Sequence, residues 1–346
     1  MSQKEKNTEN RDHGLSNIRA ISCMAVVVLH TFYTCFGSFS VKGWLYTSSV
    51  IIRNLMFWSV PCFIMVTGAL LLDPKHDVTY KKVFRKYIPR MLAALVIFSV
   101  LFKAYDIFFG FSKYTAKTIP DLLRSILTGE GLWSHMWYLY TMIALYLLIP
   151  ILRPFVRYAD RKAQQGVLTV MVIFLSILPA VTAIFSIESG FYFPVYTIYP
   201  LYLLLGGLLA DPTSKERRKG LILVPVFVVG MSYVTFFYLT NKTEFATTLK
   251  ALVNDYSFIL TIVGAAGVFL LLRKTKKHKI LEIIDQNSFG IYLIHLMPLK
   301  YIALKHPFDP YGLGLASVAV LAVAVFLLSF GVTWLLRKIP FVKKIL

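Results

Sequence analysis

Ten apolar stretches dominate this sequence, and each is long enough to cross a lipid bilayer, which takes roughly 20 residues. They lie at 15–37, 46–72, 84–109, 132–152, 166–186, 193–210, 220–240, 256–272, 287–304 and 312–336. Hydrophobic residues make up 57% of the 346 residues, and a soluble domain has no core that could hold so many long apolar runs. The sequence therefore predicts an all-α, polytopic membrane protein with about ten transmembrane helices.

The distribution of positive charge predicts how these helices are oriented. The chain has 37 Lys and Arg but 17 Asp and Glu, which gives a formal net charge of +20. If the N-terminus lies in the cytoplasm and the spans alternate, 27 of the 37 fall in cytoplasmic segments, 9 fall outside, and Arg53 is left within a span. Cytoplasmic loops of membrane proteins are rich in Lys and Arg. We therefore expect both termini in the cytoplasm, contact of the chain with membrane lipids, and no nucleic-acid partner.

No linker or internal repeat divides the chain. Residues 1–14 are polar and charged, which predicts a disordered cytoplasmic tail. Residues 15–346 then form a single transmembrane domain, with no soluble catalytic domain appended to it. The segment 119–127 is amphipathic but too short to span, so we expect it to lie at the membrane interface.

The first span holds two ionisable side chains, Arg19 and His30, which are eleven residues apart. Eleven residues come within about 20° of three full turns, so both side chains face the same way, about 16 Å apart along the axis. Arg19 would lie at the cytoplasmic mouth and His30 in the outer half. Arg19 could instead be an interfacial anchor, and His30 a histidine hydrogen-bonded between helices. Their common face favours a polar cavity along this helix.

Arg53 lies in the second span at about the depth of His30. An unpaired guanidinium there is costly, so it needs an acidic partner, carbonyl groups or a water-filled vestibule. An outer acid such as Asp106 would make Arg53 a purely structural residue. Pro61, further along the same span, predicts a break or a kink in the helix.

A basic cluster precedes the third span at Arg85, Lys86 and Arg90. These side chains would lie at the cytoplasmic interface. They could bind lipid headgroups or the phosphates of a nucleotide-bearing donor.

Histidines and aromatic residues recur in two later spans. His135, Trp137 and Tyr138 cluster near the predicted outer surface, where an aromatic belt is the alternative explanation. Tyr292 lies one turn before His295 near the middle of the ninth span, where an interhelical hydrogen bond is the alternative.

Several catalytic motifs are absent. The chain has no P-loop, no H-E-x-x-H, no G-x-S-x-G and no H-x4-D acyltransferase box. Cys23, Cys35 and Cys62 lie in apolar stretches without paired spacing, so we expect them to be buried, and we predict no metal site. The spans hold few acidic residues, which argues against a cation pump. Any chemistry must therefore come from the helix bundle and its short loops.

Five separated motifs, in this order, resemble those of the membrane acyltransferase-3 family, in its stand-alone form without an extracytoplasmic hydrolase-like domain. The motifs are NIRAISCMAVVVLH, RNLMFWSVPCFIMVTGALLL, FRKYIPRML, HMWYLYTMIALYLLIP and SFGIYLIHL. Together they run from about Ile18 to Met297, which is most of the chain. The second motif departs from the family pattern, because Thr67-Gly68 stands for the usual Ser-Gly and Cys62-Phe63 for the usual Phe-Phe.

The resemblance implies an acyltransferase of the bacterial cell membrane. Members of the family move an acyl group, usually acetyl from cytoplasmic acetyl-CoA, to a hydroxyl of a glycan or lipid-linked saccharide. Arg19 and His30 match the essential Arg and His of the family. The basic patch does not align cleanly, so the roles of Arg85 and Arg90 stay undivided.

Combining the residues with the resemblance gives each candidate a role. His30 would be the general base or a transient acyl carrier, and Arg53 would stabilise the oxyanion or position the acceptor. The donor phosphates would bind near Arg19, Arg85, Lys86 and Arg90. The acceptor vestibule would be lined by His135, Trp137 and Tyr138, with Tyr292 and His295 in support. The alternative is a transporter or flippase for a lipid-linked or anionic solute, which would use the same polar cavity without chemistry.

Overall fold

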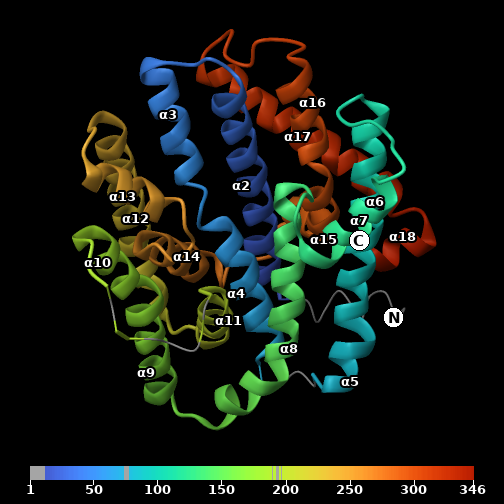
Figure 1. Ribbon diagram of the computed structural model, residues 1–346. Helices are drawn as coiled ribbons and strands as arrows, with labels where there is room; N and C mark the ends of the chain where they lie inside the picture. Colours follow the sequence, from blue (N-terminus) through green and yellow to red (C-terminus); the bar gives the residue numbers. More distant parts are fainter. Residues whose placement is uncertain (1–11, 74–77, 189, 192–194, 196) are drawn as a thin grey trace.

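The computed structural model describes residues 12–73, 78–188, 190, 191, 195 and 197–346, and every regular element within them is helical. In chain order the elements are α2 (His13–Ser38), α3 (Gly43–Asn54), α4 (Ser59–Leu71), α5 (Tyr80–Lys82), the π-turn η1 (Val83–Tyr87), α6 (Ile88–Phe108), α7 (Thr118–Thr128), the 3-10 turn η2 (Ser134–Met136), α8 (Trp137–Tyr158), α9 (Arg161–Val172), the π-turn η3 (Ile173–Ile177), α10 (Leu178–Phe185), α11 (Tyr199–Leu208), α12 (Ser214–Thr240), α13 (Glu244–Val253), α14 (Ile259–Leu272), α15 (Lys279–Ile294), α16 (Leu296–Lys305), α17 (Leu315–Leu336) and α18 (Pro340–Ile345). Figure 1 shows them as a bundle with α2 near its centre.

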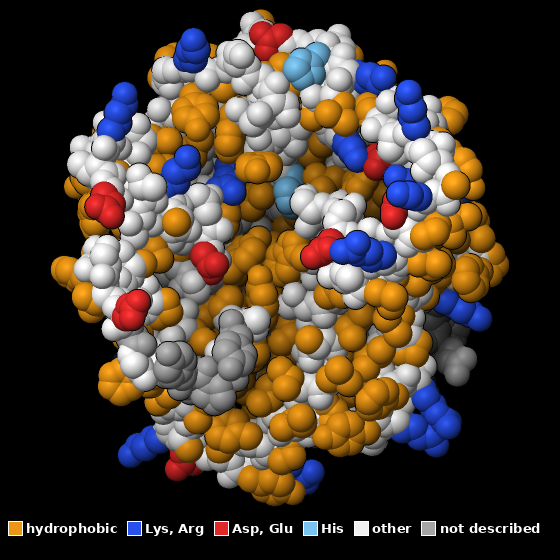
Figure 2. All heavy atoms as spheres, in the orientation of Figure 1, with side chains coloured by type: hydrophobic (Ala, Val, Ile, Leu, Met, Phe, Trp, Pro, Cys, Tyr) orange, Lys and Arg blue, Asp and Glu red, His pale blue; other side chains and the backbone are white. Residues whose placement is uncertain are grey.

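Seven stretches in these residues are long and apolar enough to cross a membrane. They are His13–Ser38, Gly43–Leu71, Tyr80–Phe108, Ser134–Tyr158, Arg161–Phe185, Ser214–Thr240 and Leu315–Leu336. Figure 2 shows hydrophobic side chains over much of the surface, with most Lys and Arg near the rim. The prediction of an all-α, multi-pass membrane protein is therefore confirmed, and seven of the ten predicted spans coincide with helices of sufficient length.

The other three predicted spans coincide with shorter helices inside the bundle. α11 has 10 residues, about 15 Å of helix, and α14 has 14. Most of the side chains of α11 are buried, as are half of those of α14. Apolar sequence does not distinguish a helix enclosed by protein from one that faces lipid, because both avoid water. The start of the predicted span 193–210 includes positions outside the described residues.

The predicted ninth span, 287–304, is wrong in its bounds and in its continuity. α15 begins eight residues earlier, at Lys279, and ends at Ile294, and α16 starts at Leu296 after a break at His295. Pro298 accounts for the break, because it has no N–H to donate to the carbonyl of Ile294. The second span is also broken, at residues 55–58, and Pro61 lies in the first turn of α4, where a missing N–H costs nothing.

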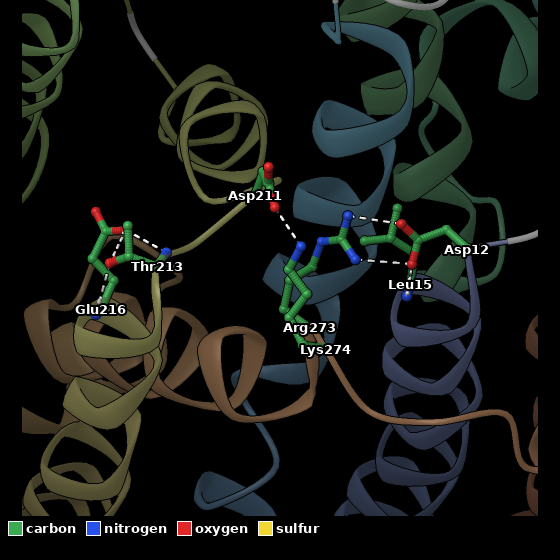
Figure 3. A network of polar contacts seen from close by, with 7 residues as sticks. All are labelled: Asp12, Leu15, Asp211, Thr213, Glu216, Arg273 and Lys274. Atoms are coloured by element: carbon green, nitrogen blue, oxygen red, sulfur yellow. Dashed lines mark hydrogen bonds and ion pairs between the residues drawn. The ribbon is translucent and has the colours of Figure 1, made fainter.

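Contacts gather the segments predicted to be cytoplasmic at one end of the bundle. Arg273 pairs with Asp12 (Nη2 to Oδ2, 2.7 Å), Lys274 pairs with Asp211, and Figure 3 shows these contacts beside the capping box at the start of α12. Further contacts join Arg153 to the Leu71 carbonyl and Arg90 to the carbonyls of the last two residues. We call this the basic end, formed by residues 12–19, 71–73, 78–90, 153–161, 211–219, 273–279 and 337–346. Described segments predicted to lie outside, among them residues 38–45 and 305–314, contact one another at the opposite end, which we call the outer end.

Two smaller predictions concern segments near the ends of the bundle. The predicted tail, residues 1–14, lies mostly outside the described residues, but Asp12 caps α2 by accepting from Leu15 N, and α2 begins at His13. The segment 119–127 falls within α7, an 11-residue helix, which is too short to span a bilayer, as predicted. All three cysteines are buried and free, also as predicted.

Two glycines let α4 and α11 pack backbone against backbone. A Cβ added at Gly68 would lie 1.9 Å from the carbonyl oxygen of Leu203, and one at Gly206 would lie 2.0 Å from that of Met65. Such close approach of two helices requires residues without side chains. Gly68 belongs to the Thr67-Gly68 pair, so the close packing gives a structural reason for the glycine of that motif.

Gly206→Ala should therefore destabilise the protein by about 1–3 kcal/mol or more, because the methyl group overlaps a backbone that cannot move away. Thermal unfolding of the purified protein in detergent measures the effect. The control is Gly331→Ala in α17, where nothing lies within 4 Å of the added Cβ, so stability should stay equal or rise slightly. Equal midpoints for the two variants would contradict the close packing of α4 on α11.

Candidate functional site

Two histidines from distant parts of the chain meet in the middle of the bundle. His295 lies at the break between α15 and α16, and its Nε2 is 2.9 Å from Nδ1 of His30 on α2. The centroids of the two rings are 4.9 Å apart. His295 is fully buried and His30 is half-buried, so the pair is largely withdrawn from water.

A parallel contact between α2 and α15 aligns this pair. At the basic end, Arg19 Nε lies 3.3 Å from Oδ1 of the buried Asp285. Eleven residues further along α2, His30 reaches His295, ten residues beyond Asp285. The residue numbers rise together on both helices, so the helices run in the same direction. Arg19 and His30 therefore share one face of α2, as the helical periodicity predicts.

The hydrogen bonds of His295 determine which ring nitrogens carry protons. Its Nδ1 lies 2.6 Å from the carbonyl oxygen of Tyr292 and 3.2 Å from that of Ile291. A carbonyl only accepts, so Nδ1 carries the proton, and Nε2 of the neutral ring keeps its lone pair. His30 must then donate from Nδ1 to His295, which leaves the lone pair of His30 on Nε2. The arrangement orients His30 as a base.

A third histidine lies beside the pair. The ring of His135, in η2 just before α8, has its centroid 5.8 Å from that of His295, and its Nε2 contacts the Leu293 carbonyl at 3.1 Å. Tyr292 donates its hydroxyl to the backbone carbonyl of His135. His135 is 2% exposed, and its Nδ1 has no hydrogen-bond partner among the described residues. The structure thus brings together four of the predicted site residues: His30, His135, Tyr292 and His295.

Arg53 lies in the last turn of α3, next to the break in the second span. Its Nη1 donates to Asn54 Oδ1 at 2.7 Å and to the side-chain oxygen of Asn254. The guanidinium carbon is 4.5 Å from the ring centroid of Phe57 and 5.2 Å from that of Tyr33. The alternative of an ion pair with Asp106 is wrong, because amides and aromatic faces hold Arg53 instead.

A cavity of about 640 Å³ extends from the basic end toward the histidines. Its polar and basic lining is set by side chains from α2, α6, α15 and the C-terminal segment: Arg19, Arg90, Asp285, Gln286, Ser288, Arg337, Lys343 and Lys344. Tyr138 and Tyr292 also line it, together with Val26 and Thr67. We call it the basic-end cavity.

A second cavity, of about 670 Å³, lies at the outer end. Aromatic rings and small polar side chains line it, among them Tyr33, Thr34, Phe36, Ser38, Tyr46, Trp133 and Ser134. One charged pair also lines it, with Lys300 Nζ 2.6 Å from Asp106 Oδ1. Asp106 accepts in addition from Trp133 Nε1 at 3.1 Å, and the Lys300 ammonium lies 4.5 Å from the Trp133 ring centroid. We call it the outer cavity.

The histidine pair separates the two cavities. Along one face of α2, Val26 lines the basic-end cavity, His30 follows one turn later, and Thr34, one further turn on, lines the outer cavity. On the other side of the pair, Tyr292 lines the basic-end cavity just before His295. Neither His30 nor His295 is among the described residues that line the two cavities, so the pair lies in the layer of protein between them.

The structure separates the predicted donor-binding residues. Arg19 and Arg90 line the basic-end cavity, whereas Arg85 and Lys86 are exposed and are not among the described residues that line it. The helical turn before α6 widens into a π-turn at Val83–Tyr87. Arg85 and Lys86 both fall within that turn, outside the cavity wall.

The predicted vestibule residues also lie elsewhere than expected. Tyr138 lines the basic-end cavity, His135 is buried behind the histidine pair, and Trp137 packs against Tyr199 and Tyr256, with ring centroids 5.3 and 5.8 Å away. None of these three lines the outer cavity in the described residues.

Sequence reasoning missed several residues that the structure places at these cavities. Asp285 precedes His295 by ten residues, nearly the spacing of Arg19 and His30, and that match of spacings was the available signal. Lys300 and Trp133 gave no signal, because nothing in the sequence brings them to Asp106. Within the described residues, no group of three or more His, Cys, Asp or Glu side chains is arranged to hold a metal ion.

Comparison with known proteins gives one match. The model of the acyltransferase domain of the acyltransferase-3 type matches residues 12–338, almost the whole chain. No curated protein and no solved structure matches this sequence.

The contact between Arg19 and Asp285 predicts coupling between the two residues. Removing Arg19 leaves a buried carboxylate without this cation, so Arg19→Met should destabilise the protein by about 3–5 kcal/mol. Arg19→Met combined with Asp285→Leu should cost clearly less than the sum of the two single changes. Unfolding in detergent measures this double-mutant cycle, and additive effects would contradict the coupling.

Proposed function

The chain belongs to the acyltransferase-3 family, and from this premise we propose that it is a membrane O-acetyltransferase. It takes an acetyl group from cytoplasmic acetyl-CoA and transfers it to a hydroxyl of a cell-surface polysaccharide or lipid-linked saccharide. One observation carries the proposal: a histidine pair, oriented as a base, lies between a basic cavity and an aromatic cavity at opposite ends of the bundle.

The proposed topology has ten membrane crossings in the cell membrane of a bacterium. The basic end faces the cytoplasm, because 27 of the 37 Lys and Arg belong to segments predicted on that side. The outer cavity then faces the cell exterior. This orientation gives the soluble donor access from one side and the envelope acceptor access from the other.

The donor would enter the basic-end cavity. Its phosphates are anionic, and the cavity carries Arg19, Arg90, Arg337, Lys343 and Lys344. The contact of Arg19 with Asp285 uses Nε, which leaves the two Nη groups for phosphate oxygens. The flexible arm of the donor would run along α2, and the distance from Arg19 to His30, about 16 Å along the helix, would bring the thioester to the histidines.

His30 would act as the general base. Its Nε2 takes the proton of the acceptor hydroxyl while that oxygen attacks the thioester carbonyl. His295 accepts from Nδ1 of His30 and so stabilises the imidazolium that forms. The tetrahedral intermediate collapses, the C–S bond breaks, and the thiolate takes the proton from His30. The described partners of Arg53 are amide oxygens and aromatic rings rather than a carboxylate, so its charge can favour the developing oxyanion.

The acceptor would bind in the outer cavity. Sugars stack on aromatic faces, and Trp133, Tyr33 and Tyr46 line this space. The paired Asp106 and Lys300 offer an acceptor and a donor for sugar hydroxyls. We therefore assign to Trp133 the acceptor-binding role that the sequence suggested for Trp137. Trp133 lies four residues earlier and lines the outer cavity.

A transporter or flippase could use the same cavities without chemistry. Membership in a family of acyltransferases argues against that reading. Transfer of acetyl from labelled acetyl-CoA to envelope glycan separates the two, because a transporter moves its solute without adding the label.

Deletion of the gene followed by mass spectrometry of the cell-surface glycans tests the proposal. We expect an acetyl mass increment to disappear and to return with the wild-type gene. His30→Ala should fail to restore it, with transfer reduced by about 10²–10⁴-fold. His306→Ala is the matched control, because His306 is exposed and lies outside both cavities. A folded His30→Ala protein that acetylates at the wild-type rate would refute the role of His30 as general base.

The role of His295 has its own signature. His295→Ala removes the acceptor for His30 Nδ1–H, so acetyl transfer should fall by about tenfold or more. His295→Gln keeps a side-chain oxygen that can accept, so it should recover part of the loss. The rate of acetyl transfer across a range of pH distinguishes a role of His295 in orienting His30 from a role in folding alone. Loss of the hydrogen bond changes the protonation of His30 and therefore the pH profile. Identical rates and pH profiles for the Ala and Gln variants would contradict the role.

A further inference from the structure

The C-terminal segment forms one wall of the basic-end cavity. Arg337, at the end of α17, and Lys343 and Lys344 in α18 line it together with Leu346. The side chains of both Ile345 and Leu346 are buried, at 6% and 5% exposed, so the segment is docked into the bundle.

Arg90 holds this wall in place. Its Nε donates to the Ile345 carbonyl and its Nη2 to the Leu346 carbonyl, both at 2.8 Å. The guanidinium carbon also lies 5.4 Å from the ring centroid of Phe289 on α15. Two of the five N–H groups of Arg90 are therefore committed to backbone carbonyls, and Arg90 links α6, α15 and the C-terminal segment.

Lys343 and Lys344 are the two cations of the wall that pair with no acidic side chain of the described residues. Asp285 is the one acidic side chain among the described residues that line the cavity, and it lies beside Arg19. Lys343 and Lys344 are exposed, and no carboxylate of the described residues pairs with either of them. Two adjacent ammonium groups without counter-ions, at the rim of a cavity, attract a polyanion.

We propose that Lys343 and Lys344 bind the phosphate groups of the nucleotide part of the acyl donor, with Arg90 positioning the segment that carries them. This inference rests on the proposed function, and it places phosphate recognition on the C-terminal segment as well as on Arg19. Lysine binds phosphate as a mobile point charge, so the pair can follow a diphosphate or a ribose phosphate without fixed geometry.

Direct binding of coenzyme A to the full-length protein in neutral detergent tests this inference without an identified acceptor. Lys343→Gln combined with Lys344→Gln should raise the Kd for coenzyme A by about tenfold, because two charge-assisted contacts are lost. The effect should shrink at high salt. Pantetheine, which has no phosphate, should bind the variant and the wild type equally.

Lys338→Gln is the matched control. Lys338 lies in the same segment, but its Nζ is 3.8 Å from the Trp334 ring centroid and it does not line the cavity in the described residues. Its replacement should leave the Kd for coenzyme A unchanged. Thermal unfolding of all three proteins checks that each variant remains folded.

The outcomes separate this inference from the proposed function. If the wild type binds coenzyme A and the double variant binds it equally well, the inference fails and the donor assignment stands. An equal loss of coenzyme A and pantetheine would show a structural effect and would also refute the inference. If the two lysines instead change only binding to vesicles containing phosphatidylglycerol, the wall recognises lipid headgroups. If the wild-type protein binds no coenzyme A, both the proposed identity of the donor and this inference are wrong.

Discussion

The parallel contact of α2 with α15 is the constraint on which the rest of the site depends. It joins Arg19 to Asp285 at the basic end and His30 to His295 in the middle of the bundle. Because each helix is rigid, a single alignment of α2 against α15 determines both contacts. A shift by one residue would turn each side chain by about 100° and break both at once.

The break after α15 determines how the histidine pair is oriented. At the break, the backbone N–H of His295 still donates to the Ile291 carbonyl at 3.0 Å, and its side-chain Nδ1 also contacts that carbonyl and the carbonyl of Tyr292. These side-chain contacts fix the proton positions of the histidine pair. An interruption that weakens the helix thereby sets the direction in which a proton can move.

The sequence was sufficient for the elements whose signals are local. Helical periodicity placed Arg19 and His30 on one face, and charge asymmetry grouped the loops that the structure gathers at the basic end. Hydropathy overstated the length of α11 and α14, because an enclosed helix is as apolar as one in lipid. Contacts between distant helices were not accessible: Arg53 with Asn254, Lys300 with Asp106 and Arg90 with the C-terminal carbonyls depend on packing that no single segment specifies.

The partners of Arg53 have an electrical consequence. Amide oxygens solvate a guanidinium but do not cancel its charge, as a carboxylate would. The field of Arg53 therefore persists in a medium of low dielectric constant, where it decays slowly with distance. Negative charge that develops within reach of this field is stabilised. The bundle thus carries a fixed positive charge at Arg53 before a ligand binds.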